Sequence, residues 1–320
     1  MKDKQKFYGH GKLLLSGEYF VMDGAKALAI PTSYGQSLQV EYKKSYQPTL
    51  HWKSYDYNDN LWFDSKFEFW HFNCLDEKST PEITDLQRIL RQVRKQNSHF
   101  LRDEMDVLVT TRLDFPRNWG LGSSSSLIYN ISQWAYISPF ELLFSTYGGS
   151  GYDIACAQSY GPILYEKKNQ GPSWSIIQFD PPFKENIYFI FLGKKTNTKQ
   201  AINIYKEKLT YTPKLTDAVS KISQDMIRAK NIEEFDQLIQ SHEKLISESL
   251  DLVPAKIQYF RDFWGEIKSL GAWGGDFIMA TSKKKISETR LYFADKGFTD
   301  FISYRDMIYS PPERPSELQA

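Results

Sequence analysis

The 320-residue sequence contains only two cysteines, Cys74 and Cys156. They could form at most one bridge, which excludes the disulfide framework of small secreted domains. The five histidines are scattered, without the paired spacing of a zinc site. No run of 18 apolar residues occurs, and the polar first residues show no secretory signal. These absences predict a soluble, cytoplasmic protein that does not interact with a membrane.

The sequence also lacks an excess of charge of either sign. Lys and Arg together number 40 and Asp and Glu 39, for a formal net charge of +1. A protein that binds nucleic acid by neutralising phosphates is expected to be much more basic, so no nucleic-acid partner is predicted. Hydrophobic residues make up 41% and charged residues 25%, as in ordinary globular proteins. At roughly 150 residues per domain, the length suggests two domains.

Several segments have clear local patterns. Thr80 and Pro81 are a typical cap and first residue of a helix. Alternating apolar residues over 105–115 predict a strand, followed by a loop of sequence Gly-Leu-Gly-Ser-Ser-Ser-Ser over 120–126 and a helix beginning near Leu127. Within 12–37, the apolar runs 13–15 and 19–22 and the tight-turn pair Asp23-Gly24, which lies between apolar runs, predict two strands joined by a tight turn. Apolar residues at helical spacing predict a further helix over 257–267.

The glycine–serine loop between a strand and a helix is suited to binding an anion. Backbone N–H groups and the helix dipole can together hold phosphate oxygens, and serine hydroxyls can contact phosphate or magnesium. No lysine follows Gly122, so this is not the common lysine-containing phosphate loop. Taken by itself, the segment is also typical of a flexible helix entry that binds nothing.

The whole string from Pro116 to Ser125 resembles the phosphate loop of the GHMP kinase superfamily, which includes galactokinase, homoserine kinase, mevalonate kinase and phosphomevalonate kinase. Residues 11–24, Gly-Lys-Leu-Leu-Leu-Ser-Gly-Glu-Tyr-Phe-Val-Met-Asp-Gly, resemble the N-terminal motif of the mevalonate and phosphomevalonate branches. Residues 149–153 are similar to the segment that carries the catalytic aspartate of these enzymes. The pentapeptide 151–155, Gly-Tyr-Asp-Ile-Ala, matches the label of a bacterial branch of the superfamily.

This resemblance implies a kinase that uses ATP and Mg²⁺ to phosphorylate a small-molecule acceptor. Asp153 would take the proton of the acceptor or orient its oxygen, and Lys12 would lie beside it. Ser124 matches the serine that contacts magnesium. Glu18 and Tyr19 lie where the family lines its acceptor pocket. The nucleotide-binding residues implied are Gly120, Leu121, Gly122, Ser123, Ser124 and Ser125.

The sequence departs from the family pattern at several places, one of them Leu192, where the family has a threonine. Many mevalonate kinases have His where this chain has Tyr19. Mevalonate kinases place a magnesium-binding glutamate on a helix between the loop and the catalytic aspartate, but here the only acidic residue of 126–148 is Glu141, at an expected helix start. The segment 271–276 resembles the C-terminal glycine loop, with Trp273 and Asp276 where small residues are usual. Outside these motifs, His242 is expected to be a hydrogen-bonded histidine at the core margin.

The resemblance implies an α+β fold with two domains and the site in the cleft between them. Residues 1–182 would form a half like ribosomal protein S5 domain 2, and 183–320 a ferredoxin-like half. The predicted acceptor is a hydroxyl of a mevalonate-like acid. Alternatives are a phosphomevalonate kinase, a non-catalytic homologue that binds a small molecule, and the related diphosphomevalonate decarboxylase. The sequence predicts neither the exact acceptor nor the oligomeric state.

Overall fold

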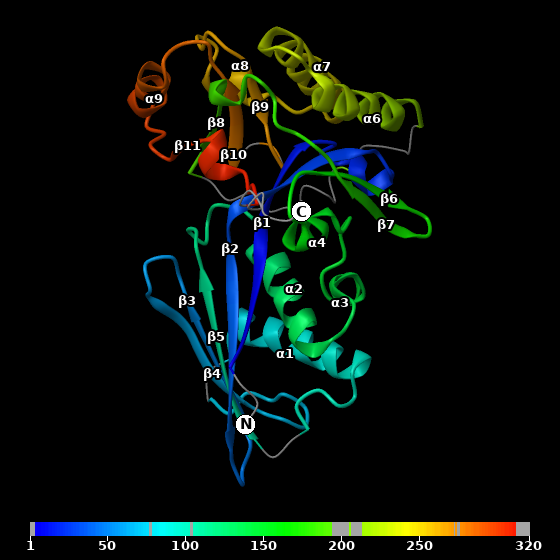
Figure 1. Ribbon diagram of the computed structural model, residues 1–320, viewed down its shortest axis with the longest axis vertical. Helices are drawn as coiled ribbons and strands as arrows, with labels where there is room; N and C mark the ends of the chain where they lie inside the picture. The colour runs from blue at the N-terminus through cyan, green and yellow to red at the C-terminus, as the bar shows by residue number, and fades with distance from the viewer. Residues whose placement is uncertain are drawn as a thin grey trace, which may run out of the picture.

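The first part of the chain builds a seven-stranded sheet, shown in the computed structural model of Figure 1, which describes residues 4–76, 79–102, 105–193, 205, 213–271, 273 and 276–311. The strand order is β4-β3-β5-β2-β6-β7, and β1 pairs with β2 off this path. β3 runs parallel to β5, and the other pairs are antiparallel. The strands are β1 (Gln5–Ser16), β2 (Ala27–Lys44), β3 (Thr49–Tyr55), β4 (Leu61–Glu68), β5 (Met105–Leu113), β6 (Ile163–Lys168) and β7 (Gly171–Ile176).

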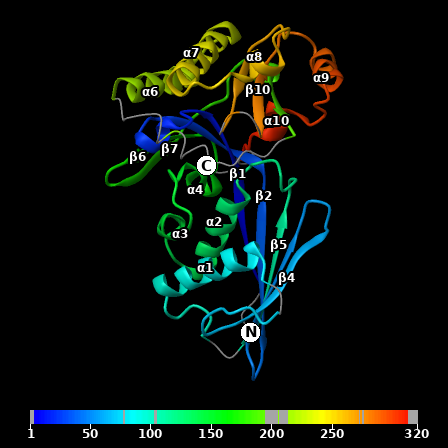
Figure 2. The same cartoon turned by 180° about the vertical axis from the view of Figure 1, so that it is seen from behind.

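Helices cover one face of this sheet (Figures 1 and 2). They are α1 (Pro81–Gln96), α2 (Ser123–Ala135), α3 (Pro139–Thr146) and α4 (Tyr152–Gln158). The predicted start of α1 is confirmed, because the Thr80 side chain accepts a hydrogen bond from the Ile83 N–H and Pro81 is the first helical residue. The predicted strand over 105–115 is confirmed as β5. The helix expected near Leu127 is α2, which begins four residues earlier and takes the serines into its first turn.

The second part of the chain builds a smaller antiparallel sheet of order β11-β8-β10-β9. Its strands are β8 (Ile187–Phe191), β9 (Ile267–Ser269), β10 (Phe277–Thr281) and β11 (Phe301–Ser303). Helices around it are α6 (Pro213–Arg228), α7 (Ile232–Leu250), α8 (Ala255–Tyr259), α9 (Ile286–Asp295) and α10 (Tyr304–Met307), and a short 3-10 turn η2 (Lys184–Asn186) precedes β8. The predicted α+β class is confirmed. No helix of the described residues is long and apolar enough to cross a bilayer.

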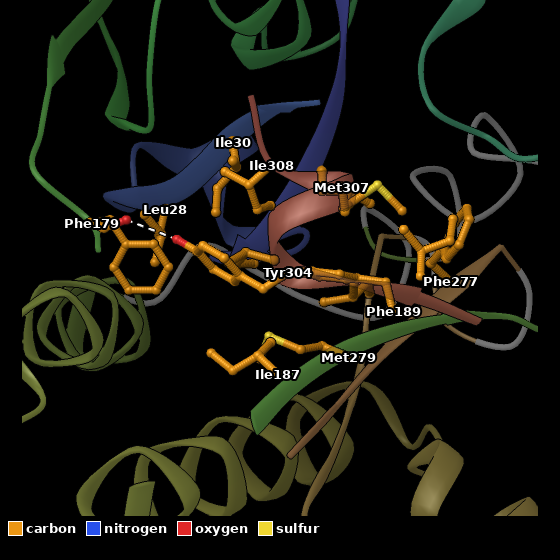
Figure 3. Close-up of a cluster of buried hydrophobic side chains, with 14 of the residues drawn as sticks. Leu28, Ile30, Phe179, Ile187, Phe189, Phe277, Met279, Tyr304, Met307 and Ile308 are labelled. Atoms are coloured by element: carbon orange, nitrogen blue, oxygen red, sulfur yellow. Dashed lines mark hydrogen bonds between the residues drawn. The ribbon is translucent and has the colours of Figure 1, made fainter. Parts of the chain in front are cut away.

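One hydrophobic core joins the two sheets (Figure 3). Side chains of β1 and β2, including Leu28 and Ile30, are buried in the same cluster as side chains of β8, β10 and α10. The Tyr304 hydroxyl donates a 2.8 Å hydrogen bond to the Phe179 carbonyl. Beyond α10 the chain returns to the large sheet, where the Tyr309 N–H donates to the Pro31 carbonyl at 3.0 Å. The two sheets are therefore held together by apolar packing and by backbone hydrogen bonds.

Two predicted elements are wrong. Residues 19–22 are not a strand: β1 ends at Ser16, and the 3-10 turn η1 (Phe20–Asp23) follows. Gly17 and Tyr19 both have positive φ, which turns the chain out of the sheet and buries Phe20 and Val21. The helix predicted over 257–267 is only the five-residue α8, followed by strand β9. Of the apolar residues spaced as in a helix, Phe260 and Ile267 are buried with side chains of β10, whereas Ile257 and Trp264 are exposed, so they do not share one buried face.

Candidate active site

The glycine–serine loop connects β5 to α2 and is held against β1. Gly120 and Gly122 both have positive φ, which glycine adopts without strain, and Gly122 is the residue before the first turn of α2. The Leu121 side chain is buried, and its carbonyl accepts a 2.9 Å hydrogen bond from the Lys12 N–H. No side chain caps the start of α2, and its first turn carries no acidic residue. This helix start therefore presents backbone N–H groups and a positive dipole end.

The serines of the loop divide into two pairs. Ser125 and Ser126 are buried, and each donates to the Gly122 carbonyl, at 2.9 and 3.2 Å. Ser123 is partly exposed and Ser124 is exposed. The inner pair thus fixes the shape of the turn, whereas the outer pair lies where a bound molecule could reach it.

Lys12 spans the loop from β1. Its Nζ donates to the Gly120 carbonyl at 2.9 Å and lies 5.9 Å from the centre of the Tyr152 ring. Burial acts to lower the pKa of Lys12, but Tyr152, Asp276 and Asp153 raise it and outweigh the burial. Lys12 is therefore a fixed positive charge between the loop and α4.

Asp153 lies in the first turn of α4, after the positive-φ residue Gly151. Its Oδ1 accepts from the Ile154 N–H at 3.0 Å. Burial raises the pKa of Asp153 above its ordinary value, and the opposing effects of Lys12 and of the Ser125 hydroxyl do not cancel this rise. The structure thus brings together Lys12, Asp153 and the loop from three separate segments of the chain.

Asp276 is a fourth group at this place. A side-chain carbon added to Gly120 would lie 2.6 Å from Oδ2 of Asp276, so the carboxylate packs directly against the loop. In the sequence, Asp276 was visible only as a departure from a glycine-rich motif. Of that motif, residues 272, 274 and 275 lie outside the described part of the chain.

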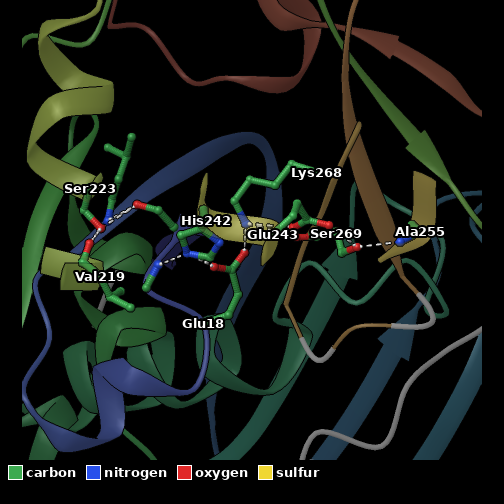
Figure 4. A network of polar contacts seen from close by, with 11 residues as sticks. Glu18, Val219, Ser223, His242, Glu243, Ala255, Lys268 and Ser269 are labelled. Atoms are coloured by element: carbon green, nitrogen blue, oxygen red, sulfur yellow. Dashed lines mark hydrogen bonds and ion pairs between the residues drawn. The ribbon is translucent and has the colours of Figure 1, made fainter. Parts of the chain in front are cut away.

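Glu18 and Tyr19, predicted to line the acceptor pocket, are both buried. Glu18 belongs to a network of buried polar side chains (Figure 4). Glu18 is 0% exposed: Lys268 Nζ lies 2.5 Å from its Oε1 and His242 Nε2 lies 3.1 Å from its Oε2. Burial opposes ionisation of Glu18, yet the Lys268 and His242 interactions outweigh it and hold the pKa below its ordinary value. Tyr19 stacks on Tyr205, with ring centres 5.6 Å apart.

Sequence reasoning missed the lysine of this buried cluster. Lys268 is 0% exposed and also faces Glu243, with 3.9 Å between Nζ and Oε1. No local pattern marks Lys268, because its partner Glu18 is 250 residues away in the sequence. His242 is hydrogen-bonded as predicted, since its Nε2 accepts from the Gly17 N–H at 3.2 Å, but it is fully buried and not at the core margin.

Glu141 differs from these groups in its exposure and in its contacts. It is exposed in the first turn of α3, where the Ser138 hydroxyl accepts from its N–H. This is the helix-start position in which a carboxylate favours the dipole. The described residues contain no group of three or more His, Cys, Asp or Glu side chains that could hold a metal ion by themselves.

Comparison with known proteins gives the fold but no close relative. No family model matches the sequence, and no curated protein matches it. Among solved structures, L. major mevalonate kinase in complex with R-mevalonate has a TM-score of 0.63 at 18% identity, with 91% of this chain and 90% of that chain covered. Streptococcus pneumoniae phosphomevalonate kinase in complex with phosphomevalonate and AMPPNP has a TM-score of 0.67 at 17% identity, with 92% and 97% covered.

More distant enzymes share the same architecture. Lactococcus lactis galactokinase complexed with galactose has a TM-score of 0.61 at 13% identity, with 97% of this chain and 94% of that chain covered. Staphylococcus aureus mevalonate diphosphate decarboxylase has a TM-score of 0.60 at 12% identity, with 96% of each covered. These neighbours all belong to the GHMP superfamily, so the chain has the GHMP kinase fold that its motifs predicted.

Proposed function

We propose that this protein is a small-molecule kinase that transfers the γ-phosphoryl group of ATP to a hydroxyl of a mevalonate-like acid. The observation that carries the proposal is the meeting of Lys12, Asp153 and an uncapped glycine–serine helix start at one place. Phosphoryl transfer depends mainly on alignment and charge stabilisation, and these three features supply both. Neighbours of the same fold include kinases, one of them bound to AMPPNP, which supports the choice of nucleotide.

Each group has a defined part in this scheme. Backbone N–H groups of 120–125 and the dipole of α2 would bind the phosphates. The acceptor oxygen would attack the γ-phosphorus, the bond from that phosphorus to the β–γ bridging oxygen would break, and the acceptor proton would pass to an Asp153 carboxylate oxygen. A raised pKa suits Asp153 to this task, because a base works best when its pKa approaches the working pH.

The loop also fits a metal-bound triphosphate. Glycine is required at 120 and 122, because a side-chain carbon at either position would meet Asp276 or Ser125 at less than 3.0 Å. The Ser124 hydroxyl and the Asp276 carboxylate are hard oxygen donors of the kind that Mg²⁺ prefers. Mg²⁺ bound with the nucleotide would neutralise charge on the transferred group.

Glu18 and Tyr19 define the acceptor side of this proposal. Because Glu18 is fully buried and ion-paired, we assign it the task of holding the turn that carries Tyr19.

A phosphomevalonate kinase is the main rival, since a phosphomevalonate-bound neighbour matches this chain as well as a mevalonate-bound one does.

A coupled assay of ADP release with a panel of acceptors tests the proposal. We expect ADP and phosphorylated acceptor in equal amounts with mevalonate or a related hydroxy acid. ADP release with phosphomevalonate instead would identify the rival kinase, and release of carbon dioxide together with phosphate from diphosphomevalonate would identify the decarboxylase. ATP binding without turnover on any acceptor would contradict the kinase proposal and support a non-catalytic binder.

A further inference from the structure

The proposed function leaves Tyr152, the aromatic residue of the pentapeptide 151–155, without a part. Tyr152 is the first residue of α4, next to Asp153, and is partly exposed. The turn before it is held by the Tyr165 hydroxyl, which donates to the Ser150 carbonyl. Its ring packs against a buried cluster of side chains from β1, β2, α4 and β6. Backbone and ring are both fixed in this way, so the protein sets the position of the Tyr152 hydroxyl.

The side chain of Lys12 is held at three points, two on the loop and one on α4. A side-chain carbon added to Gly122 would lie 3.0 Å from Lys12 Cγ, so the lysine stem lies against this glycine. Nζ donates to the Gly120 carbonyl at 2.9 Å. The third contact is Tyr152, whose ring centre lies 5.9 Å from Nζ and whose hydroxyl is hydrogen-bonded to the ammonium. An ammonium group has only donors, so the Tyr152 oxygen accepts this bond.

The contact with Tyr152 restricts where the positive charge lies. A lysine has a flexible four-carbon stem, and one hydrogen bond to the Gly120 carbonyl would leave its tip free to turn about that contact. A second bond to a fixed phenol holds the ammonium in one place. Burial raises the pKa of Tyr152 to about 12, so the phenol stays neutral and adds no charge to the site.

We infer that Tyr152 is a positioning residue for phosphoryl transfer, whose hydroxyl fixes the Lys12 ammonium between the glycine–serine loop and α4. This inference rests on the proposed function. Charge stabilisation in phosphoryl transfer depends on the exact position of the stabilising groups, and Tyr152 acts on the reaction by holding one of them. A phenylalanine at this position would keep the ring and its packing and would remove the contact with Nζ.

A double-mutant cycle on kcat tests the assignment, with Tyr152→Phe, Lys12→Met and the double variant. We expect Tyr152→Phe alone to lower kcat by roughly 10–100-fold, the factor that a hydrogen bond to a charged group is worth. In the Lys12→Met background the same change should cost no more than about twofold, because the ammonium that Tyr152 positions is already absent. Tyr160→Phe is the matched control, since Tyr160 is an exposed tyrosine just after α4, and it should leave kcat unchanged.

The pH titration of Lys12, followed by NMR of protein labelled at the lysine side-chain carbons, tests the contact without turnover. Burial lowers the pKa of Lys12, and Tyr152, Asp276 and Asp153 raise it. The Cys156 thiol also faces Lys12, but burial raises its pKa and keeps it neutral. Loss of the Tyr152 hydroxyl removes one of the raising influences, so the Lys12 signal of Tyr152→Phe should titrate at a lower pH than in the unaltered protein. The signal is identified by its absence from Lys12→Met, and Tyr152→Met is the second variant should Tyr152→Phe fail to fold.

Other results would overturn the assignment in distinguishable ways. An equal loss of kcat from Tyr152→Phe in both backgrounds would show that Tyr152 acts independently of Lys12, and no loss in either would show that it has no part in the reaction. An unchanged titration of Lys12 would show that the hydroxyl does not hold the ammonium, while the kinase proposal would stand. Absence of turnover by the unaltered protein with every acceptor would overturn the proposed function and, with it, the part of Tyr152 in phosphoryl transfer.

Discussion

The molecule contains two charged centres that are made of similar residues but differ in their exposure to solvent. Around the glycine–serine loop, Lys12 interacts with Asp153 and Asp276; in the interior, Lys268 interacts with Glu18 and Glu243. Each centre thus has one lysine and two carboxylates, drawn from both halves of the chain. The first is partly exposed, whereas the second is sealed, with Lys268 and Glu18 both 0% exposed.

The lysines differ in what they bind. Lys268 contacts a carboxylate oxygen directly at 2.5 Å, but Nζ of Lys12 donates to the Gly120 carbonyl at 2.9 Å. In the interior, burial lowers the pKa of His242 and raises that of Glu243 to about 7, so the remaining charges approach balance. At the loop, burial likewise raises the pKa of Asp153, while Lys12 stays positively charged beside it. The comparison teaches that a charged cluster sealed in the interior serves the fold, whereas a partly exposed cluster can also be reached by a ligand.

The largest expected effect is on turnover at the loop centre. Asp153→Asn should lower kcat by about 10²–10⁴-fold, the usual contribution of a general base. Thermal unfolding should show unchanged or slightly higher stability, because a neutral amide removes a carboxylate that burial disfavours. Asp217→Asn, an exposed position of α6, is the control. A kcat of Asp153→Asn within about threefold of that of the unaltered enzyme would show that Asp153 is not the general base.

A substitution in the interior centre should lower the stability of the protein. Lys268→Met leaves Glu18 buried without its partner, and breaking a buried pair in this way costs about 3–5 kcal/mol of unfolding free energy. Urea unfolding measures this loss, with the exposed Lys244→Met as control. Combining Lys268→Met with Glu18→Gln should recover part of it, because the uncompensated charge is removed. Simple additivity of the two single losses would show that the pair is not coupled.

A smaller effect concerns pH. Burial raises the pKa of Glu243 from 4.5 to about 7, against the opposing influence of Lys268 and Ser269 and with a further rise from Glu18. The folded protein therefore holds this proton more tightly than the unfolded chain does. The resulting stability is complete below pH 4.5 and is lost as pH rises through about 7.

Glu243→Gln should remove that dependence. The unfolding free energy of the variant relative to the unaltered protein should rise by roughly 1–3 kcal/mol between pH 5 and pH 8, measured by urea unfolding at both values. Glu248→Gln, exposed on the same helix, should show no such difference. If the unfolding free energies of the variant and of the unaltered protein changed in parallel across this pH range, Glu243 would be ionised throughout it.

The smallest effect is expected from a single hydroxyl. Ser269 donates to Glu243 at 2.8 Å and accepts from the Ala255 N–H at 3.0 Å. Ser269→Ala should cost about 1–2 kcal/mol in unfolding free energy, because buried polar groups lose their partner. Ser124→Ala, in the exposed part of the loop, should change stability by less than about 0.5 kcal/mol. Equal costs at the two positions would contradict the contrast between the centres.

Local signals in the sequence were sufficient for much of the fold. The cap at Thr80, the alternation of β5 and the glycine–serine turn depend on neighbouring residues, and each was predicted. The turn at Tyr19 was not, because its course depends on positive φ values that allow Phe20 to reach a core shared with Tyr205. Apolar spacing also could not distinguish α8 and β9 from one longer helix.

Only those residues of the candidate site that belong to recognisable sequence motifs were predicted. Lys12, Asp153 and the loop belong to motifs and do lie together, while their roles stay predictions. Lys268 and Asp276 reach their partners through tertiary packing, across 250 and 156 residues of sequence from Glu18 and Gly120. No periodicity or capping rule relates residues so far apart.

The apolar side chains shared by the two sheets have a consequence for synthesis on the ribosome. Leu28 and Ile30 emerge early, but Tyr304, Met307 and Ile308, which pack in the same cluster, emerge nearly 280 residues later. Until then this shared cluster is incomplete, and its apolar side chains on the large sheet are prone to aggregate. Chaperones that shield nascent apolar surface should therefore affect the yield of this protein more than that of a chain whose halves bury separate cores.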